Sequence, residues 1–188
     1  MITEVAKEFN GSLQVLPLTK ENYISFTAST ENSFTTKRKN KEIIKFKFID
    51  SLRFMASSLD KLASNLIDYP IVKKCFPNLH TEKCQLLLRK GVFPYEWFDS
   101  FEKLLYTELP EKEHFFSSLT DSHISDDDYL HAQKVWKEFD IKNISEYVQL
   151  YMKVDILLLA DIFEQFCENS LNAYRLDPCH YYTAPGLS

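Results

Sequence analysis

The stretch EYVQLYMKVDILLLA, residues 146–160, decides the fold of the second half of the chain. From Val154 to Ala160 it is apolar except for Asp155, and Asn143 followed by Glu146 is a typical helix start. We predict a helix over residues 143–172 that is buried nearly all round. Because residues four apart share a helix face, the phenol of Tyr151 and the carboxylate of Asp155 are expected to point into the same space.

This pair is a weak signal when taken alone. Chance supplies about one tyrosine-to-aspartate pair at this spacing in a chain of this length, and Tyr95 and Asp99 form a second one. A buried carboxylate must be paired, hydrogen-bonded, neutralised or bound to a metal. A bond from Asp155 to a backbone group or a nearby lysine therefore stays as open as a functional role.

The first half of the chain carries three strand patterns, which we place at residues 13–16, 23–28 and 42–49. In the third, Ile44, Phe46 and Phe48 alternate with Lys45 and Lys47, which predicts one buried face and one basic face. A short helix over residues 2–9 precedes the strands, and residues 29–40 form a hairpin connection. The chain is therefore predicted to be α/β, a three-stranded antiparallel sheet followed by a mostly helical half.

Capping residues and breakers place the remaining helices. Ser57 or Ser58 can cap one helix, and Gly91 stops another that covers residues 81–90. Ser125, with Asp128 three residues later, starts a third that runs to Phe139. Between them we predict an aromatic-rich loop over residues 91–98, where Pro94 bars a regular element, and a short helix over residues 101–106.

Composition limits the possible functions. The chain has 188 residues and a net charge of −5, yet seven basic residues lie between Thr36 and Arg53. This basic segment fits either phosphate contacts or a solvated hairpin tip. There is no signal-peptide pattern and no apolar run of about 18 residues, so we expect no membrane span. A zinc site at Cys75, His80 and Cys84 lacks a fourth ligand at the usual spacing.

Three short motifs follow one another in a meaningful order: SLRFM at residues 51–55, KGVFPY at 90–95 and YMKVD at 151–155. In that order they resemble the protein-primed group of family B DNA polymerases, in the later part of the 3′–5′ exonuclease domain. Within that group the chain is most similar to the polymerases of virus-like, self-synthesising mobile elements. The ending HYYTAPGLS, residues 180–188, is similar to the junction that leads into the palm.

The resemblance implies an incomplete ribonuclease H-like exonuclease domain over residues 1–176 and the start of the junction over residues 177–188. In the intact protein it implies DNA-directed DNA polymerisation, a nucleotidyl transfer that serves DNA replication, with 3′–5′ proofreading. The implied partners are single-stranded or primer-template DNA, a priming protein and the rest of the polymerase chain. By analogy the setting is intracellular and nuclear, although the sequence itself leaves the compartment unknown.

The resemblance also implies roles for individual residues. Proofreading of this kind uses two divalent ions held by several carboxylates, with Mg²⁺ or Mn²⁺ as the metal. The implied catalytic residues are Tyr151, which orients the attacking water, Asp155, which is a metal ligand, and Lys90, which steadies the scissile phosphate. The implied DNA contacts are Tyr95 at the primer terminus, Ser51 and Leu52 on single-stranded DNA and the priming protein, and Lys45 and Lys47 on the basic strand.

Two departures from the family pattern limit these expectations. The first exonuclease motif, D-x-E, does not occur upstream of Ser51, and the second, N-x2-3-(F/Y)-D, is also absent. Asp155 is then the one metal carboxylate that can be named, so we expect the chain as given to bind no metal stably and neither to polymerise nor to degrade DNA. Two alternatives stay open: a non-catalytic remnant that binds single-stranded nucleic acid or a partner, and a plain helical interaction module.

Overall fold

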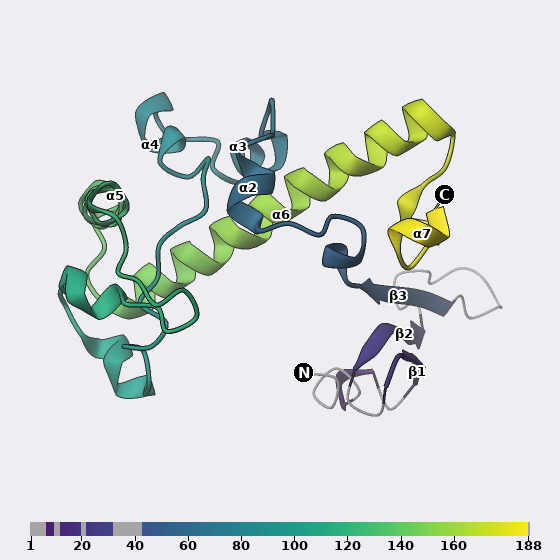
Figure 1. Cartoon of the computed structure of the whole chain (residues 1–188), viewed down its shortest axis with the longest axis horizontal. Coiled ribbons are helices and arrows are strands. Elements are labelled where there is room, and N and C mark those ends of the chain that lie inside the picture. The colour runs from purple at the N-terminus through teal and green to yellow at the C-terminus, as the bar shows by residue number, and fades with distance from the viewer. Residues whose placement is uncertain (1–6, 10–11, 20–21, 32–42, 188) are drawn as a thin grey trace. The chain divides into compact units, whose positions relative to one another are not determined.

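The computed structural model describes residues 7–9, 12–19, 22–31 and 43–187 (Figure 1). It divides into two compact units. The first combines Met1–Ala56 with Asn169–Ser188, and the second is Ser57–Glu168. The predicted boundary at residue 176 stays a prediction.

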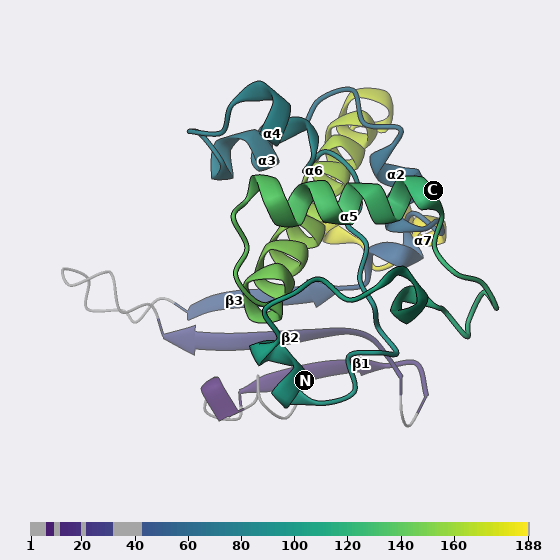
Figure 2. The ribbon, with the colours of Figure 1, turned by 90° about the vertical axis from the view of Figure 1, so that its left-hand side faces the viewer.

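The first unit contains an antiparallel sheet in the order β1-β2-β3, formed by β1 (Leu13–Pro17), β2 (Tyr23–Glu31) and β3 (Ile43–Ile49). Figure 2 shows the three strands side by side. The predicted three-stranded antiparallel sheet is confirmed, with the second strand extending further than expected. The predicted helix over residues 2–9 and the hairpin connection lie largely outside the described residues.

The apolar face of this sheet is centred on β2. Phe26 pairs with Phe48 and Ala28 with Phe46 across the ladder, and the rings of Phe26 and Phe48 stack with centroids 4.4 Å apart. Phe26 and Ala28 are buried, but Phe46 and Phe48 remain 44% and 38% exposed. The expected buried face of the third strand is wrong to this extent, because alternation fixes which side chains share a face but not how completely that face is covered.

Short elements complete the first unit. A 3₁₀ turn, η1 (Ser51–Arg53), follows β3, and Asp50 Oδ1 accepts a hydrogen bond from the Leu52 amide at 3.0 Å. After α6 the chain forms η4 (Pro178–His180) and α7 (Ala184–Leu187). Both turns begin at an aspartate whose side chain caps the turn, which is ordinary local chemistry for a chain reversal.

The second unit is helical, which confirms the mostly helical character expected for this part of the chain. Its elements are α2 (Leu59–Ala63), α3 (Pro70–Cys75), α4 (Thr81–Gln85), η2 (Phe101–Leu105), η3 (Lys112–Phe115), α5 (Asp126–Glu138) and the greater part of α6 (Ile144–Tyr174). Ser58 caps α2 by accepting from the Lys61 amide, and Ser125 caps α5 by accepting from the Asp128 amide. Both caps were predicted from the sequence.

The helix predicted over residues 81–90 ends early. α4 stops at Gln85, and the amides of Leu86, Leu87 and Leu88 then bond to carbonyls three residues back. This tighter turn places the Leu87 side chain in the core, where it is 2% exposed. Burial of an apolar side chain thus overrides local helix propensity at this point.

α6 confirms the predicted long helix, but it is not buried all round. Ile144, Tyr147, Val154, Leu158 and Ile162 form its buried line, whereas Ile156 is 64% exposed and Met152 54% exposed. Tyr147 joins Val135 and Ile141 in an apolar cluster. Among the described residues, no helix combines the length and hydrophobicity that crossing a membrane would require.

Candidate functional site

α6 carries Tyr151 and Asp155 on one half-buried face. The helix starts at a capped end, where Asn143 Oδ1 accepts from the Glu146 amide at 3.0 Å. The competing pair is different, because Tyr95 and Asp99 lie outside any helix and the carboxylate of Asp99 pairs with Lys103 at 3.0 Å. Only the pair on α6 has the geometry that its spacing predicts.

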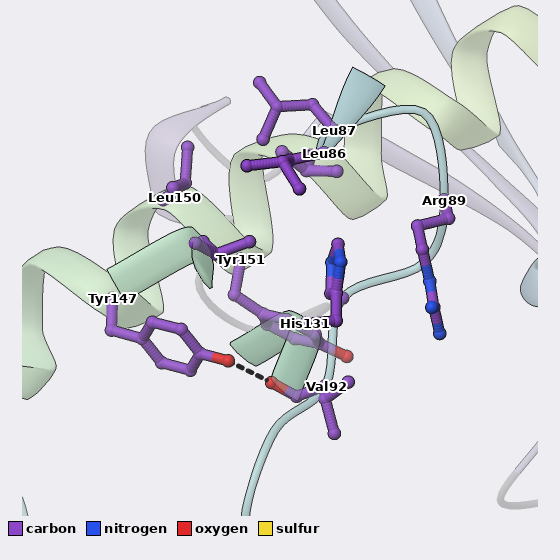
Figure 3. Close-up of a pocket in the computed structure, with 11 residues that line it drawn as sticks. Leu86, Leu87, Arg89, Val92, His131, Tyr147, Leu150 and Tyr151 are labelled. Carbon is purple, nitrogen blue, oxygen red and sulfur yellow. Dashed lines mark hydrogen bonds between the residues drawn. The ribbon is translucent and has the colours of Figure 1, made fainter. Parts of the chain in front are cut away.

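The loop that follows α4 is held against this face of α6. The Tyr147 hydroxyl donates a hydrogen bond to the Val92 carbonyl at 2.6 Å (Figure 3). The Phe93 ring stacks on the Tyr151 ring, with centroids 5.2 Å apart and an interplanar angle of 28°. Pro94 is fully buried. The loop therefore has a fixed position on the helix, and with it the flanking residues Lys90 and Tyr95.

Gly91 lets this loop approach closely. A Cβ atom at Gly91 would lie 2.8 Å from Cδ2 of Tyr151, which is closer than a side chain tolerates. Gly91 was predicted as a helix stop, but α4 already ends at Gln85, so its role in the structure is a different one. It leaves room for the Tyr151 ring.

Tyr95 reaches the site from the end of the same loop. Its hydroxyl hydrogen-bonds to the Tyr151 hydroxyl, although the two residues are 56 positions apart in the sequence. The Tyr95 side chain is 61% exposed. Tyr95 is therefore not a core residue, and its exposed aromatic ring lies beside Tyr151.

Burial dominates the electrostatics of Asp155. It raises the pKa of the carboxyl above its ordinary value, although the Tyr151 hydroxyl and the positive charge of Lys90 act in the opposite direction. Asp155 Oδ1 is buried and has no hydrogen-bond partner among the described residues. The described residues therefore supply a positive charge near this carboxylate but no hydrogen bond to its Oδ1.

Tyr151 is held as a neutral phenol. Burial raises its pKa most, and the hydrogen bond with Tyr95 and the negative charge of Asp155 raise it further. Tyr147, which is more deeply buried, also has a raised pKa because of burial. At neutral pH the Tyr151 hydroxyl can therefore still donate a hydrogen bond, as the orientation of a water molecule requires.

The unpartnered Oδ1 of Asp155 fits one ligand of a hard divalent cation. A two-ion centre needs several such oxygens. Within the described part of the chain, Asp155 belongs to no group of three or more side chains that could share an ion. The residues present therefore do not fit a complete two-metal centre.

A cavity of about 20 Å³ lies beside Tyr151, lined by residues of the loop, α5 and α6. Tyr151, Tyr147 and His131 point toward it in Figure 3. Its volume suffices for about one water molecule and excludes a nucleotide. Burial lowers the pKa of His131 to about 4, so the imidazole is neutral at physiological pH.

Asp161 was not anticipated from the sequence. It is 2% exposed, and its two carboxylate oxygens accept the amides of Ile71 at 2.8 Å and Val72 at 3.0 Å. These amides open α3, where the helix dipole also favours a negative charge. Because Asp161 and Ile71 are 90 residues apart, no local sequence pattern predicts this contact between α3 and α6.

The structure gathers four of the eight predicted site residues, Lys90, Tyr95, Tyr151 and Asp155, in the second unit. The other four, Ser51, Leu52, Lys45 and Lys47, belong to the first unit. There Leu52 and Lys45 are exposed, Ser51 is half-buried, and Lys47 bonds to the backbone of residues 179 and 181. Their roles stay predictions.

No curated protein and no solved structure matched the chain. A family model matches residues 2–188, and its description is DNA polymerase type B, organellar and viral.

Proposed function

Because the chain belongs to the organellar and viral type B DNA polymerases, we propose that it supplies part of the 3′–5′ proofreading site of a DNA-directed DNA polymerase. In this proposal residues 1–176 belong to a ribonuclease H-like exonuclease domain and residues 177–188 to the junction with the palm. We also propose that the intact polymerase is protein-primed, that it resembles the polymerases of self-synthesising mobile elements, and that it serves DNA replication.

One observation carries the proposal. The buried, unpartnered Oδ1 of Asp155 lies beside a neutral phenol, Tyr151, with Lys90 near enough to act on the carboxyl electrostatically. Leaving a buried carboxylate oxygen unpartnered is costly for a fold. Such a group is typical of a site where a cation or substrate completes the set of partners.

Each residue has a chemical task in this site. The Tyr151 hydroxyl donates a hydrogen bond that orients a water molecule, and Lys90 offers positive charge to the phosphodiester. Tyr95, exposed beside Tyr151, offers its ring to an unstacked base at the primer terminus. Asp155 would be one ligand of the divalent ions, Mg²⁺ in most polymerases of this family. Bound ions would polarise the phosphodiester and activate water.

The other predicted contacts complete the proposal on the first unit. Leu52 is an exposed apolar side chain on a turn, and Lys45 is an exposed cation on β3. We assign Ser51, Leu52 and Lys45 to single-stranded DNA, with the priming protein as a second partner of the turn. Because one carboxylate cannot hold two ions, the 188 residues alone are not expected to hydrolyse DNA.

The experiment is binding of a short, fluorescent single-stranded oligonucleotide with a free 3′ end to the purified chain. Tyr95→Ala should weaken binding about tenfold, because stacking on one aromatic ring contributes on the order of 1–3 kcal/mol per base. Lys90→Met should weaken it as well and reduce its salt dependence. Asp99→Asn, which alters an exposed carboxylate four residues from Tyr95, is the matched control. Equal affinity in all four proteins would argue against a DNA site at this loop.

A further inference from the structure

The two lysines of β3 have different environments. Lys45 and Lys47 share one face of the strand, opposite Ser29 and Thr27 of β2, and alternation makes them equivalent. In the structure Lys45 is exposed and Lys47 is half-buried. The reason lies in the segment that follows α6, which returns to the same unit.

The Lys47 ammonium contacts this segment three times. It donates hydrogen bonds to the Cys179 carbonyl at 2.9 Å and to the Tyr181 carbonyl at 3.1 Å. It also lies 4.1 Å from the centroid of the Tyr182 ring, a cation–π contact. An ammonium has three N–H donors, so two are used by carbonyls and the charge faces an aromatic ring.

The segment has little internal structure of its own. η4 is a single 3₁₀ turn, in which the Cys179 amide bonds to Asp177 Oδ1 at 2.9 Å and the Tyr181 amide bonds to the Pro178 carbonyl at 3.0 Å. Pro178 is buried, but Cys179, His180 and Tyr182 are exposed. A single turn of this kind is marginal alone, so its position depends on contacts from outside it.

We propose that Lys47 is a latch that holds residues 179–182 against β3, and that it is not a contact to nucleic acid. A phosphate that approached the Lys47 ammonium would compete with the two carbonyls and the aromatic ring that already contact it. Lys45 is exposed on the same face and can meet a phosphate without that exchange. This inference does not depend on the proposed proofreading role, because it concerns only contacts within the first unit.

The test is amide hydrogen exchange of the purified full chain, followed by mass spectrometry of peptides that cover residues 178–184. Lys47→Met keeps most of the aliphatic side chain and removes the three donors. It should speed exchange in these peptides about tenfold or more, relative to peptides from β2 in the same protein. Lys45→Met is the matched control and should leave exchange unchanged. The same exchange rate in wild type and Lys47→Met, or an equal rise in Lys47→Met and Lys45→Met, would overturn the proposal.

A second pair of variants covers the case in which Lys47→Met unfolds the unit. Tyr182→Leu removes the ring beneath the ammonium, whereas Tyr182→Phe keeps it. Exchange over residues 178–184 should rise severalfold in Tyr182→Leu and stay at the wild-type rate in Tyr182→Phe. Equal exchange in Tyr182→Leu and wild type would contradict the part of the proposal in which the cation–π contact helps to hold the segment.

Discussion

Asp161 joins α6 to α3, and we expect its replacement by asparagine to be among the most destabilising single changes in the second unit. Its oxygens accept two amide hydrogen bonds, from Ile71 at 2.8 Å and from Val72 at 3.0 Å. Asn keeps one acceptor and turns an NH₂ group toward the other amide. Because Val72 is fully buried, its N–H group cannot bond to water instead.

The size of the effect follows from these contacts. A hydrogen bond to a charged group contributes about 1.5–3 kcal/mol, and leaving a buried amide without a partner costs about 1–3 kcal/mol. We therefore expect Asp161→Asn to lower the free energy of unfolding by about 2–3 kcal/mol. In a chain of this size that lowers the melting temperature by roughly 4–12 °C.

The assay is urea unfolding at neutral pH, followed by far-ultraviolet circular dichroism. Glu164→Gln is the matched control, because Glu164 is an exposed carboxylate three residues along the same helix. It should change stability by less than about 0.5 kcal/mol. A loss below about 0.5 kcal/mol in Asp161→Asn would refute the reasoning, since the carboxylate would then not be the joint between the two helices.

Three further predictions concern the site. Burial lowers the pKa of His131 from 6.5 to about 4, so the free energy of unfolding that is present above pH 6.5 should fall by up to about 3 kcal/mol as the pH drops to 4. Urea unfolding at several pH values should show this loss in wild type and a smaller loss in His131→Gln. The raised pKa of Asp155 means that its ionised form opposes folding at neutral pH. Asp155→Asn should therefore be more stable than wild type at pH 7, with no advantage below pH 3.8, and a variant less stable at pH 7 would contradict this. Gly91→Ala should lower the free energy of unfolding by about 1–3 kcal/mol and change the near-ultraviolet circular dichroism of the tyrosines. Gly186→Ala is the control and should change neither quantity, because its Cβ would meet only Thr183 Oγ1 at 3.4 Å.

Local patterns predicted the features that local chemistry controls. Alternation located the strands, and the residues Ser58, Ser125 and Asn143 located the starts of three helices. The four-residue spacing placed Tyr151 and Asp155 on one face of α6. Each of these features depends on neighbours within about one helical turn or one strand, which is the range that a sequence pattern reports.

Long-range contacts were not predictable in the same way. The bond between the hydroxyls of Tyr95 and Tyr151 spans 56 residues, and that between Asp161 and the Ile71 amide spans 90. No periodicity encodes such pairs. The exposed ring of Phe46 and the different environments of Lys45 and Lys47 have the same cause, because tertiary packing decides which parts of a face are covered.

The central claim is that Asp155, with Tyr151, belongs to a proofreading site. The most direct test replaces the matching segment of an exonuclease-active polymerase of the same family with residues 2–188 and measures Mg²⁺-dependent removal of nucleotides from a 3′-labelled single strand. DNA synthesis by the chimera serves as the control for folding. We expect Asp155→Ala to reduce exonuclease activity by a factor of about 100 or more without reducing synthesis, and Asp99→Ala to leave both unchanged. Full exonuclease activity in Asp155→Ala would contradict the assignment.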